Sequence, residues 1–500
     1  MDWFFNFFDK IDPALAQKLM AYDAQQPLLF NTGLFMMLFL GFVLIYQAMR
    51  RWRTAKMVVT ILFSLYFYYK NSAEYCFILL GICLSDYVLG LWMGAARRNW
   101  VRRCIVLLNV VLNVGMLVYF KYFNLLLQTF ASMNGTHFDA LDIILPAGIS
   151  FFTFRSISYI VDLYRRKMEP CRNIMDYMFF LTFFPPLLAG PVVRAKDMLP
   201  QIRENRNATR AMVAEGLFLI MCGLIKKMVI ADYISGNFVD RIFENPTLYT
   251  GFENVMGTIG FTIQIYCDFS GYSDMAIGLA LLLGFRFPDN FNAPFKSQSP
   301  SEFWHRWHIS LSTWLRDYVY IPLGGNRCGK LRCYFNKFAT MIVGGIWHGA
   351  SWMYLFWGGY QGVLLIGHQV LKKAIPSSWY MKPSTLRRAL NIFVTFVLAL
   401  IGFGIFRSMS MQGLGDHYQM IFTNFHPEIA LEFISAYSLI VFLIVLALIM
   451  HFTPSHWREN LMERYLRMPL PVQSITLAAV LFIVVQTRNA DLVPFIYLQY

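Results

Sequence analysis

The sequence predicts an all-α polytopic membrane protein of about 11 transmembrane helices with re-entrant segments. Hydrophobic residues make up 57% of the 500 residues and charged residues only 14%, whereas soluble proteins carry roughly 25% charged residues. The mean hydropathy is +0.47. A chain with so little polar surface cannot form a water-soluble globule, and the same figures exclude a disordered chain, a collagen and a coiled coil. Its long apolar segments must be solvated by lipid or by each other.

The first long apolar run covers residues 28–49 and is followed by a basic cluster at 50–56. Residues 1–26 carry four aspartates and two lysines, so they lack the basic stretch of a cleavable signal peptide. Because cytoplasmic loops concentrate Lys and Arg, this asymmetry predicts an N-terminus outside and residues 50–56 in the cytoplasm.

Further apolar runs fill the first 284 residues, and basic clusters follow every second one, at 97–103 and 165–167. This alternation supports the predicted topology. The segment 176–193 contains Pro185-Pro186 and Gly190-Pro191, which break a helix, so it is predicted to be re-entrant. The runs lie at 57–69, 75–93, 104–127, 141–163, 211–232 and 252–284.

Residues 286–338 hold eight Lys or Arg against three acids and are predicted to be a cytoplasmic or interfacial catalytic segment. Residues 371–388 are also basic, so the apolar stretch 339–369 must begin and end on the same side. A hairpin or broken helix there would hold His348 within the membrane. Counting onward gives spans at 389–406, 430–451 and 472–486, outside residues 408–429, cytoplasmic residues 456–468 and a C-terminus outside.

The formal net charge of +14 is explained by the excess of Lys and Arg in the cytoplasmic loops of a membrane protein. No basic run with interleaved aromatic residues stands apart from the apolar segments. We therefore expect no nucleic-acid partner. The eight cysteines are scattered, and Cys328 and Cys333 form a C-x4-C pair without a second pair, which is a poor zinc signal. We expect no metal and mostly reduced thiols.

A helix is predicted to begin at Ser299, with Ser299 as N-cap, Pro300 at the first position and Glu302 closing a capping box. Continued through residue 317, it would place His308 on an apolar face with Trp304 and two leucines. Mixed aromatic and basic residues suit the membrane interface. His305 is interpreted as an incidental member of an aromatic anchor at the membrane interface. His308 is a titratable group on the apolar face and therefore needs another explanation.

His348 is the strongest single candidate, since an ionisable side chain inside an apolar run marks a functional site by default. The alternative is a neutral imidazole hydrogen-bonded between helices. Glycines at 344, 345 and 349 allow close approach to the backbone. Two histidines at the membrane suit general-base chemistry on a hydroxyl. There is no P-loop, no complete nucleophile elbow around Ser273 and too few histidine boxes for a di-iron site.

Long motifs in the second half of the chain resemble the membrane-bound O-acyltransferase family, most closely its bacterial members that O-acetylate alginate or peptidoglycan. The D-alanyl transfer protein of teichoic acid synthesis is a related member of the family. The resemblance covers nearly the whole chain, including 145–152 and the terminal 494–497. The motifs are Tyr-Cys-Asp-Phe-Ser-Gly-Tyr-Ser-Asp at 266–274, Asn-Phe-Asn-Ala-Pro-Phe at 290–295, the stretch 303–325, and Gly-Ile-Trp-His-Gly-Ala-Ser-Trp at 345–352.

The resemblance implies that His348 is the catalytic histidine and His308 a supporting one. It also implies a ring of helices around a thinned centre, with a tunnel from a cytoplasmic acyl donor to an outside acceptor. One departure is His305, where relatives usually carry Arg. Candidates to bind the donor or line the tunnel are Trp304, Arg306, Asn292, Arg316, Asp317 and Trp347.

The function that the resemblance implies is transfer of an acetyl group from a cytoplasmic thioester, acetyl-CoA or as the alternative an acylated carrier protein, toward hydroxyls of an extracytoplasmic polysaccharide. An exported SGNH-type acetyltransferase would be the partner. We expect one membrane domain over residues 1–500, in contact with lipids of the bacterial inner membrane, and no cofactor. A polysaccharide transporter or flippase, or a non-catalytic scaffold of an envelope acetylation complex, are the alternatives.

Overall fold

The computed structural model describes residues 19–374 and 384–487, and every regular element in these two ranges is a helix. The all-α prediction is therefore confirmed there. Both chain ends, and with them the predicted location of the termini and the 494–497 motif, lie outside the described residues. The first helices are α3 (Gly33–Ala48), α4 (Arg53–Ser72), α5 (Cys76–Ala95), α6 (Asn99–Leu117), α7 (Phe123–Met133), α8 (Ile149–Tyr164), α9 (Ile174–Thr182) and α10 (Ala195–Arg203). They are followed by α11 (Arg210–Leu224), α14 (Gly251–Leu282), α15 (Pro300–Arg306), α16 (Ile309–Leu315), α17 (Lys330–His348), α18 (Trp352–Ala374), α20 (Thr385–Arg407), α21 (Met411–Thr423), α22 (Ala430–Ala436), α23 (Ser438–Phe452), α24 (Ser455–Arg467) and α25 (Leu470–Gln486).

Three helical stretches in the described ranges are long and apolar enough to cross a membrane, 53–95, 99–133 and 385–407. A fourth is reached if α22 and α23, bent by 98° at their junction, count as one span. Many remaining apolar helices are short or interrupted, as α3 and α25 are. A multi-pass membrane protein is thus evident, whereas the count of about 11 spans and the ring around a tunnel stay predictions.

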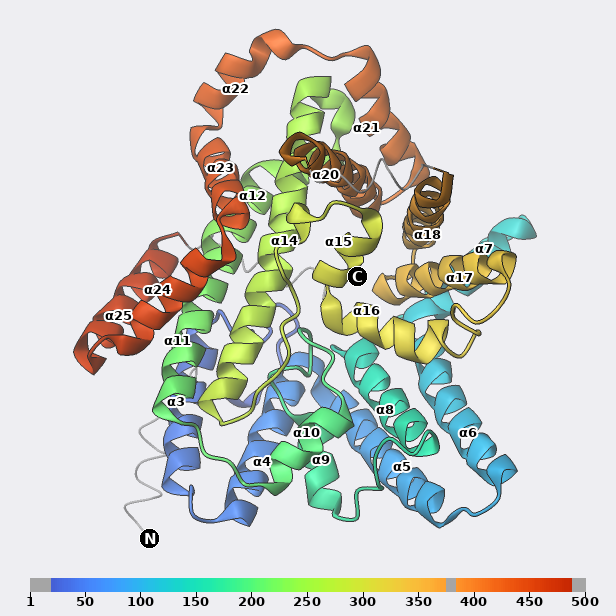
Figure 1. Cartoon of the computed structure of the whole chain (residues 1–500), viewed down its shortest axis with the longest axis vertical. Coiled ribbons are helices and arrows are strands. Elements are labelled where there is room, and N and C mark those ends of the chain that lie inside the picture. Colours follow the sequence, from blue (N-terminus) through green and yellow to red (C-terminus); the bar gives the residue numbers. More distant parts are fainter. Residues whose placement is uncertain (1–18, 375–383, 488–500) are drawn as a thin grey trace.

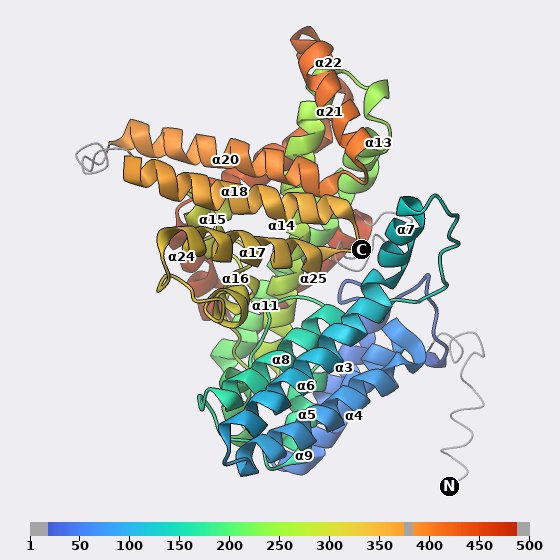
Figure 2. The same cartoon turned by 90° about the vertical axis from the view of Figure 1, so that its right-hand side faces the viewer.

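The N-terminal half forms a layer in which α4, α5, α6 and α8 run side by side (Figures 1 and 2). The chain reverses between α4 and α5 at Ala73, whose φ is 47°. The run predicted at 141–163 is helical only from Ile149, because Pro146 and the left-handed Gly148 (φ 72°) precede the helix. Within 176–193, α9 ends at Thr182 after nine residues, and the remaining residues are buried but not helical. A nine-residue helix cannot span, in agreement with the predicted broken segment.

The long helix α14 crosses the molecule and packs antiparallel on α11 through glycines at both contacts. A Cβ at Gly278 would lie 2.6 Å from the carbonyl oxygen of Gly216, and one at Gly271 would lie 2.8 Å from that of Gly223. Helices approach this closely only where the side chains are absent. The Asp-Phe-Ser-Gly-Tyr-Ser-Asp motif lies on α14 and thus belongs to the central packing of the fold.

Helices α17 and α18 form an antiparallel hairpin, as the charge pattern of 339–369 predicted (Figure 2). Gly345 meets Gly358 near the tip, and Phe338 meets Gly362 farther down. The pairing shows that the N-terminal end of α17 and the C-terminal end of α18 lie at the same end of the hairpin. His348, the last residue of α17, lies at its tip.

Candidate active site

The helix predicted from Ser299 to residue 317 is not continuous, and this part of the prediction is wrong. Ser299 does cap α15, accepting a hydrogen bond from the Glu302 amide, but the Glu302 carboxylate accepts from Gln298 rather than closing the box. The helix ends at Arg306, and α16 starts at Ile309. Between them His308 adopts a left-handed conformation, φ 44° and ψ 56°. Such a conformation is strained for a residue with a Cβ and is concentrated at functional sites.

Asn290 explains the break. Its side-chain oxygen accepts hydrogen bonds from the backbone N–H of Ser310 (3.2 Å), the Ser310 hydroxyl (2.8 Å) and His308 Nδ1 (3.1 Å). Its backbone carbonyl accepts from the Ile309 amide at 2.9 Å, and its amide nitrogen donates to the Ser273 hydroxyl. The start of α16 is therefore fixed by a residue 18 positions earlier in the chain, and its role was missed by reasoning from helical periodicity.

The contact with Asn290 also sets the tautomer of His308. The Asn290 side-chain oxygen takes a hydrogen bond from a backbone N–H, so it is the acceptor toward His308, and Nδ1 carries the ring proton. Nε2 of a neutral ring then has only a lone pair. His308 is 0% exposed, and its Nε2 has no hydrogen-bond partner among the described residues. This nitrogen can accept a hydrogen bond or a proton.

His348 lies within an aromatic enclosure and is 4% exposed. Its ring centroid is 5.0 Å from that of Trp357 on α18 and 5.2 Å from that of Phe406 on α20, both edge to face. Trp347 contacts both histidines, since its ring centroid is 4.9 Å from that of His348 and 5.8 Å from that of His308. The structure therefore brings together the two histidines that the sequence singled out, from two separate segments.

The remaining candidates divide into two groups. Trp304 belongs to the enclosure, since its ring lies 5.8 Å from that of Trp357 and its Nε1 donates to Gln361. Arg306 and Asn292 instead brace the turn before α16, because Arg306 pairs with Glu302 at 2.9 Å and donates to the Asn292 carbonyl. These two residues do not contact either histidine ring.

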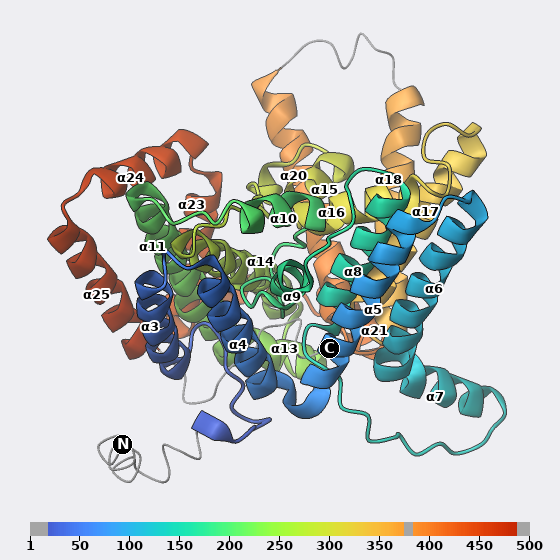
Figure 3. The ribbon, with the colours of Figure 1, turned by 90° about the horizontal axis from the view of Figure 1, so that it is seen from below.

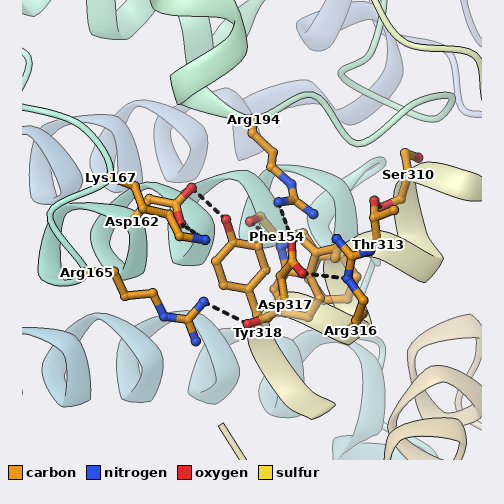
Figure 4. A network of polar contacts seen from close by, with 11 residues as sticks. Phe154, Asp162, Arg165, Lys167, Arg194, Ser310, Thr313, Arg316, Asp317 and Tyr318 are labelled. Atoms are coloured by element: carbon orange, nitrogen blue, oxygen red, sulfur yellow. Dashed lines mark hydrogen bonds and ion pairs between the residues drawn. The ribbon is translucent and has the colours of Figure 1, made fainter. Parts of the chain in front are cut away.

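Arg316 and Asp317 lie in a polar network at the end of α16 (Figure 4). The Asp317 carboxylate accepts from Arg194 and from Arg316, each at 2.7 Å, and Arg165 donates to its backbone carbonyl. Burial alone would raise the pKa of Asp317, but the hydrogen bonds from Arg316 and Arg194 outweigh it and lower the pKa to about 2. Asp317 is therefore ionised at neutral pH and holds two guanidinium groups in place.

An aromatic stack connects this network with the histidines. Phe154 lies flat on Trp314, with 3.7 Å between ring centroids, and also stacks on Trp347 at 5.4 Å. The site thus has a polar, basic end at Asp317 and an apolar, aromatic end at His348. Among residues 19–374 and 384–487, no three His, Cys, Asp or Glu side chains are grouped so that they could hold a metal ion.

Two buried histidines set among membrane helices, of which His308 has a defined tautomer, define a membrane-embedded site for acid–base chemistry. Comparison with known proteins names that class. The model of the membrane-bound O-acyltransferase family matches residues 171–412. The chain belongs to this family: it is a multi-pass membrane O-acyltransferase.

The chain is similar to three kinds of characterised relative. It is 41% identical over 406 residues to the probable alginate O-acetylase AlgI of Pseudomonas aeruginosa, covering 79% of this chain and 75% of that protein. It is 34% identical over 415 residues to the peptidoglycan O-acetyltransferase of Helicobacter pylori, covering 77% and 78%. It is 31% identical over 287 residues to the teichoic acid D-alanyltransferase of Streptococcus thermophilus, covering 52% and 67%.

Proposed function

We propose that this enzyme moves an acetyl group from a cytoplasmic thioester toward hydroxyls of an extracytoplasmic polysaccharide, of the alginate or peptidoglycan kind. The observation that carries the proposal is the placement of two buried histidines, His308 and His348, against the same tryptophan ring, that of Trp347. The names of the two acetylating relatives support the acyl group and the acceptor class. A bacterial inner membrane and an exported SGNH-type acetyltransferase that completes the transfer belong to the same proposal.

His348 is the general base in this mechanism. It removes the proton of the attacking hydroxyl as the oxygen bonds to the thioester carbonyl carbon, a contribution typically worth about 10²–10⁴-fold. When the carbon–sulfur bond breaks, the imidazolium returns that proton to the departing thiolate. The aromatic enclosure of Trp347, Trp357 and Phe406 excludes water, so that the acetyl group is not lost to hydrolysis.

His308 orients the donor rather than polarising its carbonyl. The lone pair at Nε2 can accept a hydrogen bond but cannot donate one to a carbonyl oxygen. An amide N–H of the pantetheine arm of acetyl-CoA, or of an acylated carrier protein, is a matching donor. The Asn290 contact places the proton of the neutral ring on Nδ1, so that the lone pair is on Nε2, on the opposite side of the ring from Asn290.

The donor enters from the basic end of the site, where Arg316 is half exposed and Arg327 and Lys330 are exposed. Cationic side chains suit the phosphate groups of CoA. Replacing Arg316, Arg327 and Lys330 by Gln is expected to raise the apparent donor KM and to weaken its dependence on ionic strength. Initial rates of CoA release by membranes at several acetyl-CoA and salt concentrations measure both effects. Unchanged KM and salt dependence would contradict this entry route.

The test of the proposed function is His348→Ala, compared at equal amounts of folded protein in membranes. Acetyl ester released from the envelope polysaccharide is expected to fall to background, and His308→Ala is expected to reduce it strongly. His417→Ala is the matched control, because His417 is equally buried but bonds Thr258 on α14, away from the site. Normal acetylation by a folded His348→Ala protein would contradict the proposal, and a transporter or scaffold would give that result.

A further inference from the structure

The end of helix α17 that carries His348 is held by side chains from the other half of the molecule. Lys121 Nζ donates to the backbone carbonyls of Trp347 (2.8 Å) and His348 (3.0 Å). The neighbouring Tyr122 hydroxyl donates to the carbonyl of Ile346 at 2.5 Å. Three consecutive carbonyl groups are thus satisfied by two adjacent residues that lie more than 220 positions earlier in the chain.

These contacts supply hydrogen-bond donors to the carbonyl groups at the C-terminal end of α17. The last four carbonyl groups of an α-helix have no partner within the helix, and α17 stops at His348 because Gly349 is extended. The C-terminal end of a helix carries partial negative charge, which a lysine stabilises. In a membrane each unsatisfied carbonyl costs several kcal/mol. Without Lys121 and Tyr122, the carbonyl groups of Ile346, Trp347 and His348 would lose these hydrogen bonds.

The backbone of the donor segment is specialised for this contact. Residues Val118–Tyr122 form a π-helical turn, η2, between α6 and α7. A π-turn holds an extra residue, so it changes the facing of the residues after it by about 100° relative to an uninterrupted α-helix. Such turns are frequent at functional sites. Lys121 also lies within a stretch that can span the membrane, 99–133, where a lysine is expensive and needs a specific partner.

We propose that Lys121 is a positioning residue for His348: by ending α17 at a fixed place, its ammonium group holds the imidazole inside the enclosure of Trp347, Trp357 and Phe406. This inference rests on the proposed function, because the position of the ring matters for the rate only if His348 transfers a proton. A lysine that merely reached the membrane surface would direct its ammonium group to water or lipid headgroups, whereas both contacts of Lys121 are to the backbone of the site.

The test compares Lys121→Met with Lys56→Met in membranes that contain equal amounts of folded protein. Lys56 is a matched control, because it is also a buried lysine that donates to a backbone carbonyl, that of Arg206, and to Asn207, none of which belongs to the site. The rate of CoA release is measured over a range of acetyl-CoA concentrations. For Lys121→Met we expect kcat to fall about 10- to 100-fold, as small misplacements of a catalytic group do, with donor KM within twofold of wild type. For Lys56→Met we expect kcat within twofold.

Two more variants distinguish the effect of the hydrogen bonds to the end of α17 from an effect of side-chain size. Lys121→Arg keeps a cationic donor and is expected to recover at least threefold of the lost kcat. Tyr122→Phe removes only the hydroxyl on Ile346 and is expected to fold normally with a smaller loss of kcat, so it decides the question if Lys121→Met does not fold. The inference is overturned by unchanged kcat in Lys121→Met or, if that protein is not recovered, in Tyr122→Phe. A rise in KM that accounts for the loss, or no recovery with Arg, also overturns it.

Failure of this inference is distinguishable from failure of the proposed function. If His348→Ala abolishes acetylation while Lys121→Met is unaffected, His348 is catalytic but is positioned by other contacts. If a folded His348→Ala protein acetylates normally, the proposed function fails, whatever the Lys121 variants do.

Discussion

Asn290 is the residue on which the geometry of His308 most depends. One amide side chain breaks a helix, places a histidine in the left-handed region and selects its tautomer. None of these effects is visible from the 299–317 sequence itself, because the partner lies 18 residues upstream. Helical periodicity therefore predicted one continuous helix where the structure has two, although it did place His308 among buried residues.

Asn290→Ala is expected to destabilise the protein and to reduce acetylation, since buried donors on Ser310 and His308 would lose their acceptor. Each buried polar group left unsatisfied costs about 1–3 kcal/mol. Ser273→Ala is the milder control, because it removes only the acceptor of the Asn290 amide nitrogen. Thermal unfolding in detergent, together with acetyl release, measures both effects. Equal melting temperatures for Asn290→Ala and wild type would contradict the account.

Asp317 gives a prediction that depends on pH. Its pKa of about 2 in the folded protein is below the value of about 3.9 expected when unfolded. The ionised carboxylate thus contributes stability that is complete above about pH 4 and lost as the pH falls toward 2. Asp317→Asn is expected to lower the melting temperature at pH 7 and to lower it less at pH 3. A difference in melting temperature that is the same at both values would show that ionisation is not responsible.

At the scale of elements, the α17–α18 hairpin positions His348, and the packing of its two helices depends on glycine residues at their contact. A Cβ at Gly345 would lie 2.3 Å from the carbonyl oxygen of Tyr354 and 3.0 Å from Gly358. From the basic residues on both sides of 339–369, charge counting predicted a hairpin or a broken helix, and the structure has the hairpin. The glycine contacts that lock it were recognised in the sequence only as break points.

Gly345→Val is expected to separate the two helices and to abolish acetylation, with less folded protein recovered. Gly367→Val is the matched control, because Gly367 lies on α18, the other helix of the hairpin, and a Cβ there meets nothing within 4 Å. Fluorescence-detected size-exclusion chromatography of the two variants, followed by acetyl release, tests this. The packing account fails if both variants behave alike.

At the scale of the whole molecule, α7 and the basic helix α24 lie toward opposite faces. Figure 3 shows α10 and α24 toward one face and α7 toward the opposite one. The basic helix α24 and the residues before α17 are predicted to be cytoplasmic, and α7 to lie toward the outside. The side itself is a prediction from the distribution of Lys and Arg, since the fold alone has no preferred direction across a membrane.

Cys328 is a natural reporter of this orientation, because it is exposed and lies in the 286–338 segment. In a Cys104→Ala background, which removes the other exposed cysteine, a membrane-impermeant maleimide is expected to label Cys328 in inside-out vesicles and not in intact cells. A cysteine introduced at Asn134, after α7, serves as the control and is expected to show the opposite pattern. Labelling of Cys328 in intact cells would contradict the predicted orientation and indicate the opposite one.

The features that could be predicted from the sequence differ in physical origin from those that could not. Charge and hydropathy act over whole segments, so the all-α class, the hairpin and the broken stretch 176–193 could be predicted. Contacts between distant segments decide the rest: Asn290 on His308, and Lys121 on the end of α17. Lys121 did carry the signal that identified His348, an ionisable side chain inside an apolar run, but its partner became evident only in three dimensions.

The hairpin also bears on how the protein is made. Its two helices meet at a tip that follows His348, and α17 is not among the described helices that are long and apolar enough to cross a membrane, so we do not expect it to insert as a span by itself. The carbonyl groups at the end of α17 accept from Lys121 and Tyr122, which are synthesised earlier, and its glycines at 345 and 349 pack against α18. The early α6–α7 segment can thus receive the tip of the hairpin as it emerges, and the site is completed during biosynthesis when the second half of the chain docks on the first.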